Sequence, residues 1–136
     1  MQKIIINGIS SAELVEVQTP EPVKDWALVK INAAPMCTEY KLYRDGEISA
    51  YLGHEAAGEV VAVDTSNKVA VGDRVVVMPQ YPCGECELCQ ADEYIHCQNI
   101  IDLKAFTGHP EGSATYAQYL IKPETLLPVI PEKYEL

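Results

Sequence analysis

The 136-residue sequence lacks any pair of glycines separated by a single residue. Its eight glycines stand at positions 8, 46, 53, 58, 72, 84, 108 and 112, so no Gly-x-Gly can be written. That spacing begins the dinucleotide-binding fingerprint, in which glycine backbone approaches a pyrophosphate closely. The sequence therefore predicts that this chain does not itself hold a dinucleotide, and its net charge of -10 would repel one.

Basic residues are also scarce, with ten Lys and Arg against twenty Asp and Glu. This balance argues against binding to nucleic acid, whose phosphate backbone attracts basic patches. No apolar run approaches the roughly 20 residues that cross a bilayer, so no membrane partner is expected. The sequence opens without a signal peptide, which predicts a cytoplasmic protein whose acidity serves solubility.

What the sequence does contain is a series of short apolar stretches punctuated by glycine and proline. They cover residues 4–6, 13–18, 26–31, 59–63, 74–78 and 116–121. Asn7-Gly8 predicts a hairpin turn between the first two, and residues 37–44 predict a short helix ended by Gly46. Pro123, Pro128 and Pro131 predict an irregular exit. Many short strands with little helix indicate one mainly β domain, a small barrel or sandwich.

Four of the five cysteines fall together, with two, two and seven residues between successive thiols: Cys83, Cys86, Cys89 and Cys97. Disulfides fit poorly, because the thiol count is odd and no signal peptide is present. An iron–sulfur cluster of the bacterial ferredoxin type closes with a three-residue gap and a proline, whereas the last gap here is seven. The spacing favours a structural zinc ion in a lobe of residues 82–98, with all four positions filled by sulfur.

A second group of candidate ligands consists of His54 and Glu55 in the stretch Gly53-His54-Glu55-Ala56-Ala57-Gly58, together with Cys37. Taken singly, a surface histidine usually binds nothing, and an unpaired cysteine is most often a small buried apolar residue. Taken together, a thiolate, an imidazole and a carboxylate are the ligand types of an open zinc site.

The order of these motifs resembles the zinc-containing medium-chain dehydrogenases, which include alcohol, sorbitol and threonine dehydrogenases. The resemblance rests on Gly53-His54-Glu55-x-x-Gly58, then Val71-Gly72-Asp73-Arg74-Val75, then the cysteine lobe. The stretch Tyr116-Ala117-Gln118-Tyr119 is similar to the aromatic-Ala-acidic-Tyr strand of that family. The resemblance covers nearly the whole chain.

The resemblance implies that residues 1–136 form a GroES-like β-barrel carrying a structural and a catalytic zinc. In the family this barrel is joined to a Rossmann domain that binds NAD(P), which this chain does not contain. Cys37 matches the first catalytic-zinc ligand, His54 the second, and Glu55 the carboxylate beside the metal; the cofactor domain supplies a last ligand. The implied reaction is oxidation of a small alcohol or polyol, with zinc lowering the pKa of the substrate hydroxyl. The isolated chain is expected to be inactive.

The chain departs from the family pattern after Cys37, where the family reads x-Ser/Thr-Asp and this chain reads Thr38-Glu39-Tyr40. Either Thr38 and Glu39 fill the proton-relay and histidine-orienting roles one position early, or neither role survives. The segment from Cys37 to His54 is also short for the family. A non-catalytic, zinc-stabilised binding module that keeps the barrel is therefore the alternative function. The oligomeric state is left open.

Overall fold

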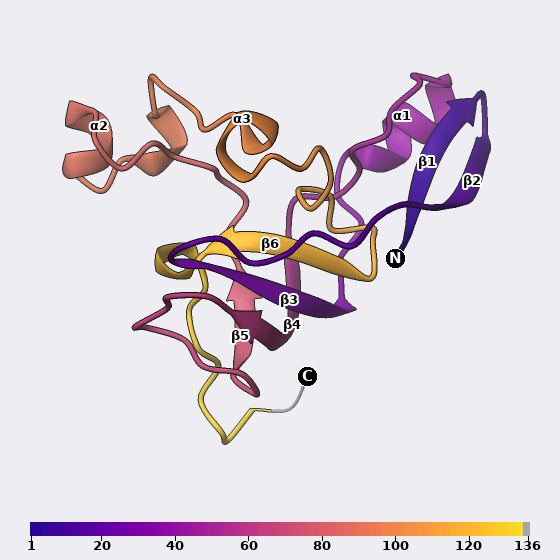
Figure 1. The fold of residues 1–136 in the computed structure, drawn as a ribbon. Coiled ribbons are helices and arrows are strands. Elements are labelled where there is room, and N and C mark those ends of the chain that lie inside the picture. Colours follow the sequence, from indigo (N-terminus) through magenta and orange to yellow (C-terminus); the bar gives the residue numbers. More distant parts are fainter. Residues whose placement is uncertain (135–136) are drawn as a thin grey trace.

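The computed structural model describes residues 1–134, which form strands linked by short helical turns (Figure 1). The strands are β1 Gln2–Gly8, β2 Ser11–Glu16, β3 Trp26–Ala33, β4 Ala56–Val63, β5 Arg74–Val77 and β6 Tyr119–Pro123. The helices are α1 Glu39–Asp45, α2 Glu87–Gln90, α3 Leu103–Thr107, and the 3-10 turns η1 Tyr94–His96 and η2 Glu124–Leu126. The prediction of a mainly β chain with short helices is confirmed. No helix in the described range is long and apolar enough to cross a membrane.

The predicted N-terminal hairpin is present, but its turn is displaced from the predicted position. Gly8 pairs with Ser11, so the turn residues are Ile9 and Ser10 rather than Asn7 and Gly8, and Ser10 has φ 49°. The Asn7 side chain accepts from the Ser11 hydroxyl at 2.7 Å and donates to the second strand at Glu13, 3.2 Å away. Asn7 therefore stabilises the hairpin from its side instead of occupying its turn.

The larger sheet has the order β5-β4-β3-β6, and all its neighbouring strands are antiparallel. Its core side chains are fully buried: Ala27, Val29, Val60, Val75 and Leu120. Close contact between β3 and β4 depends on Gly58, because a Cβ atom there would lie 2.2 Å from the Lys30 carbonyl oxygen. Gly58, the last residue of the Gly53-His54-Glu55-x-x-Gly58 motif, thus serves strand pairing.

The proline-rich exit is more regular than predicted. The Met78 and Val76 N–H groups donate to the Leu126 and Pro128 carbonyls, and the Ile130 N–H donates back to Arg74. Residues 126–130 therefore cover the outer edge of β5. Such pairing satisfies N–H and C=O groups that an open sheet edge would leave exposed.

The last predicted strand begins later than expected, at Tyr119 instead of Tyr116. Before it, the Tyr116 carbonyl accepts from the Ile4 N–H at 2.9 Å, and Ala117 forms a bridge with Lys3. The segment then crosses to β3, where Tyr119 pairs with Lys30. Residues 116–121 thus pair first with β1 and then with β3. The pattern of apolar residues could not indicate this change of partner.

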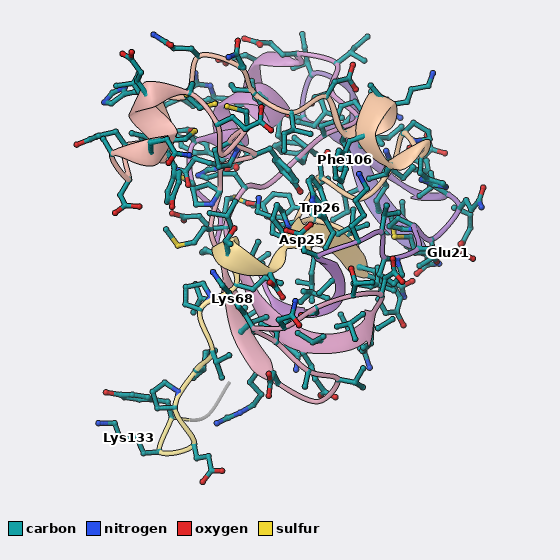
Figure 2. The ribbon with its side chains drawn as sticks, turned by 60° about the vertical axis from the view of Figure 1, so that its left-hand side comes forward. Glu21, Asp25, Trp26, Lys68, Phe106 and Lys133 are labelled. Atoms are coloured by element: carbon teal, nitrogen blue, oxygen red, sulfur yellow. The ribbon has the colours of Figure 1, made fainter. Side chains whose placement is uncertain are left out.

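An aromatic stack around the buried Trp26 lies beside the sheet. The Trp26 ring stacks on Phe106 at 4.8 Å between centroids and on Tyr81 at 5.7 Å, and Figure 2 shows Trp26 next to Phe106. The Lys122 ammonium lies 3.5 Å from the Tyr81 ring centroid, and the residue is only 1% exposed. Burial lowers the pKa of Lys122 to about 7 and raises that of Tyr81.

We expect Lys122→Met to flatten the pH dependence of stability. The folded-state pKa of Lys122 lies below its ordinary value of 10.5, so between about pH 7 and 10.5 the unfolded chain binds more protons. Its contribution to the free energy of unfolding therefore rises with pH, by up to about 1.4 kcal/mol per pH unit. Urea titrations between pH 7.5 and 9.5 measure this slope.

The matched control is Lys30→Met, which removes an exposed lysine from the paired strand β3. The slope of this variant should remain that of the native chain. Equal slopes for both variants and the native chain would show that Lys122 is charged in the folded state.

Candidate metal centres

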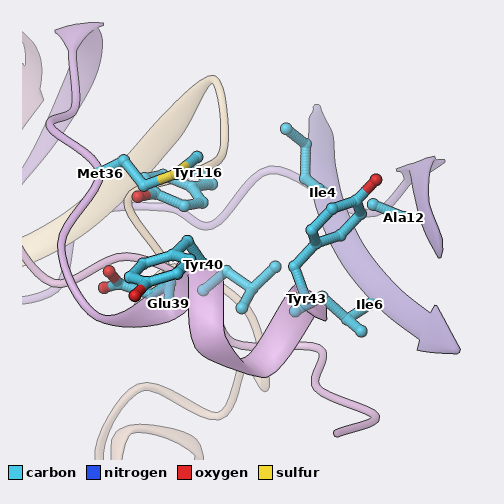
Figure 3. Close-up of a pocket in the computed structure, with 9 residues that line it drawn as sticks. Ile4, Ile6, Ala12, Met36, Glu39, Tyr40, Tyr43 and Tyr116 are labelled. Carbon is cyan, nitrogen blue, oxygen red and sulfur yellow. The ribbon is translucent and has the colours of Figure 1, made fainter. Parts of the chain in front are cut away.

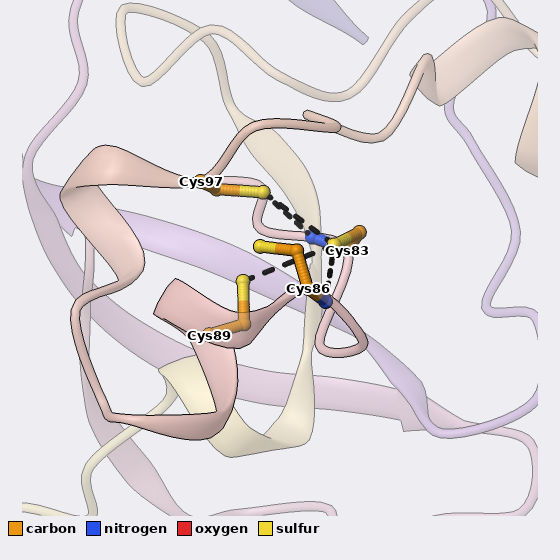
Figure 4. A group of neighbouring side chains, drawn as sticks. All are labelled: Cys83, Cys86, Cys89 and Cys97. Carbon is orange, nitrogen blue, oxygen red and sulfur yellow. Dashed lines mark hydrogen bonds between the residues drawn. The ribbon is translucent and has the colours of Figure 1, made fainter.

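The four clustered cysteines converge as their spacing predicts (Figure 4). Cys83 follows β5, Cys86 and Cys89 belong to the turn of α2, and Cys97 follows η1. Their sulfur atoms all lie within 4.8 Å of one another. Within residues 1–134 this is the one group of three or more His, Cys, Asp or Glu ligand atoms that close together.

The sulfur separations fit a tetrahedral zinc ion. The Cys83 Sγ lies 3.6 Å from the Cys97 Sγ and 3.9 Å from the Cys89 Sγ. A regular tetrahedron with Zn–S distances of about 2.3 Å places its sulfurs about 3.8 Å apart. The residues present therefore fit a zinc ion, and a closed site of this kind leaves no position for a substrate.

Backbone N–H groups point at these sulfurs. The Cys83 and Asn99 N–H groups donate to the Cys97 Sγ at 3.3 and 3.4 Å, and the Cys86 N–H donates to the Cys83 Sγ at 3.4 Å. N–H donors from Gln98 and Cys89 lower the pKa of Cys86 to about 6. Burial raises the pKa of Cys89 to about 12. Since a metal binds the thiolate form, metal binding releases a proton at Cys89.

A cavity of about 430 Å³ separates this lobe from the sheet. Trp26, Phe106 and Pro123 line it from the side of the main domain, and Cys83 and Cys89 from the side of the lobe. The lobe therefore meets the main domain around this cavity. All four of its candidate metal ligands belong to the lobe itself.

Glu39 connects the two other candidate ligands, Cys37 and His54. Its carboxylate is 2.6 Å from His54 Nδ1 and accepts from the Cys37 backbone N–H at 3.1 Å. Burial opposes ionisation, but hydrogen bonds from its own backbone N–H, from His54 and from Cys37 outweigh it and lower the pKa of Glu39. With Nδ1 held by a carboxylate, His54 keeps Nε2 for a metal, which is the arrangement of metal-binding histidines.

The other predicted site residues are less closely arranged. Cys37, Thr38 and Glu55 are exposed, so Cys37 is not the small buried apolar residue that a lone cysteine usually is. Cys37, His54 and Glu55, all in the described part of the chain, do not form a group of ligand atoms close enough together to hold a metal ion. The Thr38 hydroxyl makes no capping bond to α1. The structure thus shows a Glu39–His54 pair whose carboxylate also accepts from the backbone N–H of the exposed Cys37.

An apolar groove of about 230 Å³ lies between α1 and β1 (Figure 3). Its lining consists of Ile4, Ile6, Ala12, Met36, Glu39, Tyr40, Tyr43, Leu52 and Tyr116. Neither Cys37 nor His54, both in the described part of the chain, is among them, so the groove lies beside these ligands. The sequence reasoning missed this groove, although Tyr40 and Tyr43 stand one helical turn apart on α1.

Comparison with known proteins agrees with this arrangement. Residues 23–132 match the family described as alcohol dehydrogenase GroES-like domain. The chain belongs to this family, the GroES-like domain of the zinc-containing medium-chain dehydrogenases. It is 29% identical over 141 residues to a sorbitol dehydrogenase of Bacillus subtilis (strain 168), covering 97% of this chain and 39% of that protein. It is 36% identical over 121 residues to an L-threonine 3-dehydrogenase of Pyrococcus furiosus, covering 82% and 33%.

The fold comparison confirms the GroES-like architecture. The crystal structure of an NAD-dependent alcohol dehydrogenase superposes with a TM-score of 0.78 at 28% identity, covering 99% of this chain and 41% of that one. The chain thus spans between a third and about two fifths of the length of these relatives. The predicted family and its GroES-like fold are confirmed.

We expect Cys83→Ser to release the zinc ion from the lobe and to lower the melting temperature by roughly 10 °C or more, because the free energy of structural zinc binding is also folding free energy. Elemental analysis and thermal denaturation measure the two effects. Cys37→Ser is the matched control, since it removes an exposed thiol outside the quartet and should leave the lobe zinc in place. Unchanged metal content in Cys83→Ser would rule out the four-sulfur site.

Proposed function

We propose that residues 1–136 are the catalytic domain of a zinc-dependent NAD(P) dehydrogenase that oxidises a small alcohol or polyol. In the complete protein a Rossmann domain would follow, supply the last zinc ligand and bind the nicotinamide cofactor; we assign the protein to the cytoplasm. The observation that carries the proposal is the Glu39 carboxylate between His54 Nδ1 and the Cys37 N–H. Family membership, with zinc-type and NADP-bound relatives, supports the same cofactors.

Each residue would have a distinct role. The Cys37 thiolate and His54 Nε2 would hold the catalytic zinc, with the Glu55 carboxylate beside it. When bound, zinc supplies a Lewis acid that lowers the pKa of a substrate hydroxyl, and the nicotinamide accepts the hydride. Glu39 would keep the His54 ring in one tautomer and orientation, and the exposed Thr38 hydroxyl would carry the substrate proton toward solvent.

The alternative is a non-catalytic binding module stabilised by the lobe zinc alone. The observation that favours it is the separation of Cys37, His54 and Glu55, which do not form a compact cluster. Glu39 favours the enzyme, because its carboxylate makes a hydrogen bond to His54 Nδ1, as a carboxylate that orients a metal-binding histidine must. Two zinc ions per complete protein support the enzyme, and one supports the module.

In the complete protein, Cys37→Ala or His54→Ala should abolish alcohol oxidation, because each removes a proposed ligand of the catalytic zinc. Reduction of NAD(P) with a panel of secondary alcohols and polyols measures this, while elemental analysis confirms that the lobe zinc remains. The isolated 136-residue chain should show neither turnover nor measurable NAD binding by calorimetry. Full activity in both variants would contradict the proposed function.

Glu39→Gln should lower kcat/KM by about tenfold to a hundredfold, the loss typical when a carboxylate behind a metal-binding histidine is removed. Thr38→Val should instead lower the rate and shift its pH profile, because it removes only a proton carrier. Tyr40→Phe is the control, since it alters an exposed ring on the same helix. If Glu39→Gln and Tyr40→Phe have the same activity, Glu39 does not orient His54.

A further inference from the structure

Tyr116 contacts the two segments that carry Cys37 and His54, from a part of the chain distant in sequence from both. Its hydroxyl donates to the Pro35 carbonyl at 3.1 Å, two residues before Cys37. Its ring packs against Gly53, the residue before His54. In Figure 3 the ring lies beside Met36, the residue before Cys37 in the sequence. One side chain therefore connects both ligand segments.

The contact with Gly53 leaves no free space. Gly53 has φ +80°, and a Cβ atom there would lie 2.8 Å from the Tyr116 Cδ1 and 2.2 Å from the Thr115 Oγ1. The backbones are also joined, because the Tyr116 N–H donates to the Leu52 carbonyl at 3.0 Å and the Thr115 N–H to the Gly53 carbonyl at 3.4 Å. Residues 52–53 are thus held by both side chains and main chain.

Tyr116 is itself fixed in place. Its carbonyl accepts from the Ile4 N–H of β1 at 2.9 Å, which ties it to the N-terminal hairpin. The paired strand β1 thereby supports a ring that contacts two loops.

We propose that Tyr116 is a positioning residue that sets the separation of Cys37 and His54 through its hydroxyl bond to Pro35 and its packing on Gly53. The inference rests on the proposed function, since it assigns the two loops to one metal site. Ligands on separate loops need such support, because a site displaced by about 1 Å loses much of its binding or catalytic power. Tyr116→Phe isolates the effect, since it keeps the ring and deletes one hydrogen bond.

The test uses cobalt(II) as the probe ion on the 136-residue chain. Thiolate-to-cobalt absorption that is present in the native chain and absent in Cys37→Ala reports the site at Cys37, while absorption common to both reports the lobe. Tyr116→Phe should weaken the Cys37-dependent binding by about threefold to tenfold, the usual net effect of one hydrogen bond. Lobe binding should not change. Tyr51→Phe is the matched control, because it removes a hydroxyl from an exposed ring whose residue lies between Cys37 and His54 in the sequence.

A second readout needs no metal. The Cys37 N–H donates to Glu39, so hydrogen exchange at this amide reports the order of its loop, and Tyr116→Phe should speed that exchange. If cobalt binds at Cys37 and Tyr116→Phe matches Tyr51→Phe, the positioning role is overturned while the proposed function stands. If the native chain shows no Cys37-dependent absorption, the site needs the last ligand from the cofactor domain, and the proposed function is then tested by Cys37→Ala and His54→Ala in the complete protein. In that case hydrogen exchange decides the role of Tyr116: unchanged Cys37 exchange in Tyr116→Phe overturns it, and faster exchange upholds it.

Discussion

The pairing of β3 with both β4 and β6 is the interaction on which the rest of the fold depends. β3 is the only described strand that is hydrogen-bonded to two others over five or more residues, and it carries the fully buried Ala27 and Val29. Gly58 allows the backbone of β4 to approach the Lys30 carbonyl. Because His54 lies just before β4 and Cys37 just after β3, the register of this pair brings the two candidate ligands to the same end of the sheet.

The two candidate centres differ in what holds them. In the lobe, short turns and backbone N–H groups bring four sulfurs within 4.8 Å of one another, so the ligand set is local in sequence. At Cys37 and His54 the supports are long-range: Glu39 from α1, Tyr116 from the approach to β6, and β1 behind them. A structural site can thus be complete within one segment, whereas the proposed catalytic site depends on several elements of the domain.

The parts that could be predicted from the sequence are those governed by local spacing. The cysteine quartet, the strand at Trp26 and the helix ended by Gly46, which has φ 75°, all follow from neighbouring residues and agree with the structure. The turn of the hairpin was displaced because Asn7 bonds across the strands. The role of Glu39 could not be decided from the sequence. After Cys37 this carboxylate stands one position earlier than in the family pattern, and the sequence does not show whether it contacts His54. The apolar pattern predicts Tyr116 in a strand, although its contacts belong to three separate segments.

The position of Trp26 has an optical consequence. It is the single tryptophan of the chain, 2% exposed, stacked between Tyr81 and Phe106, and it faces the cavity shared with Cys83 and Cys89. Indole emission shifts to longer wavelength when the ring meets water, and thiols or metals nearby alter its intensity. The intrinsic fluorescence of the chain is therefore a built-in reporter of how closely the lobe is seated on the domain, readable without any label.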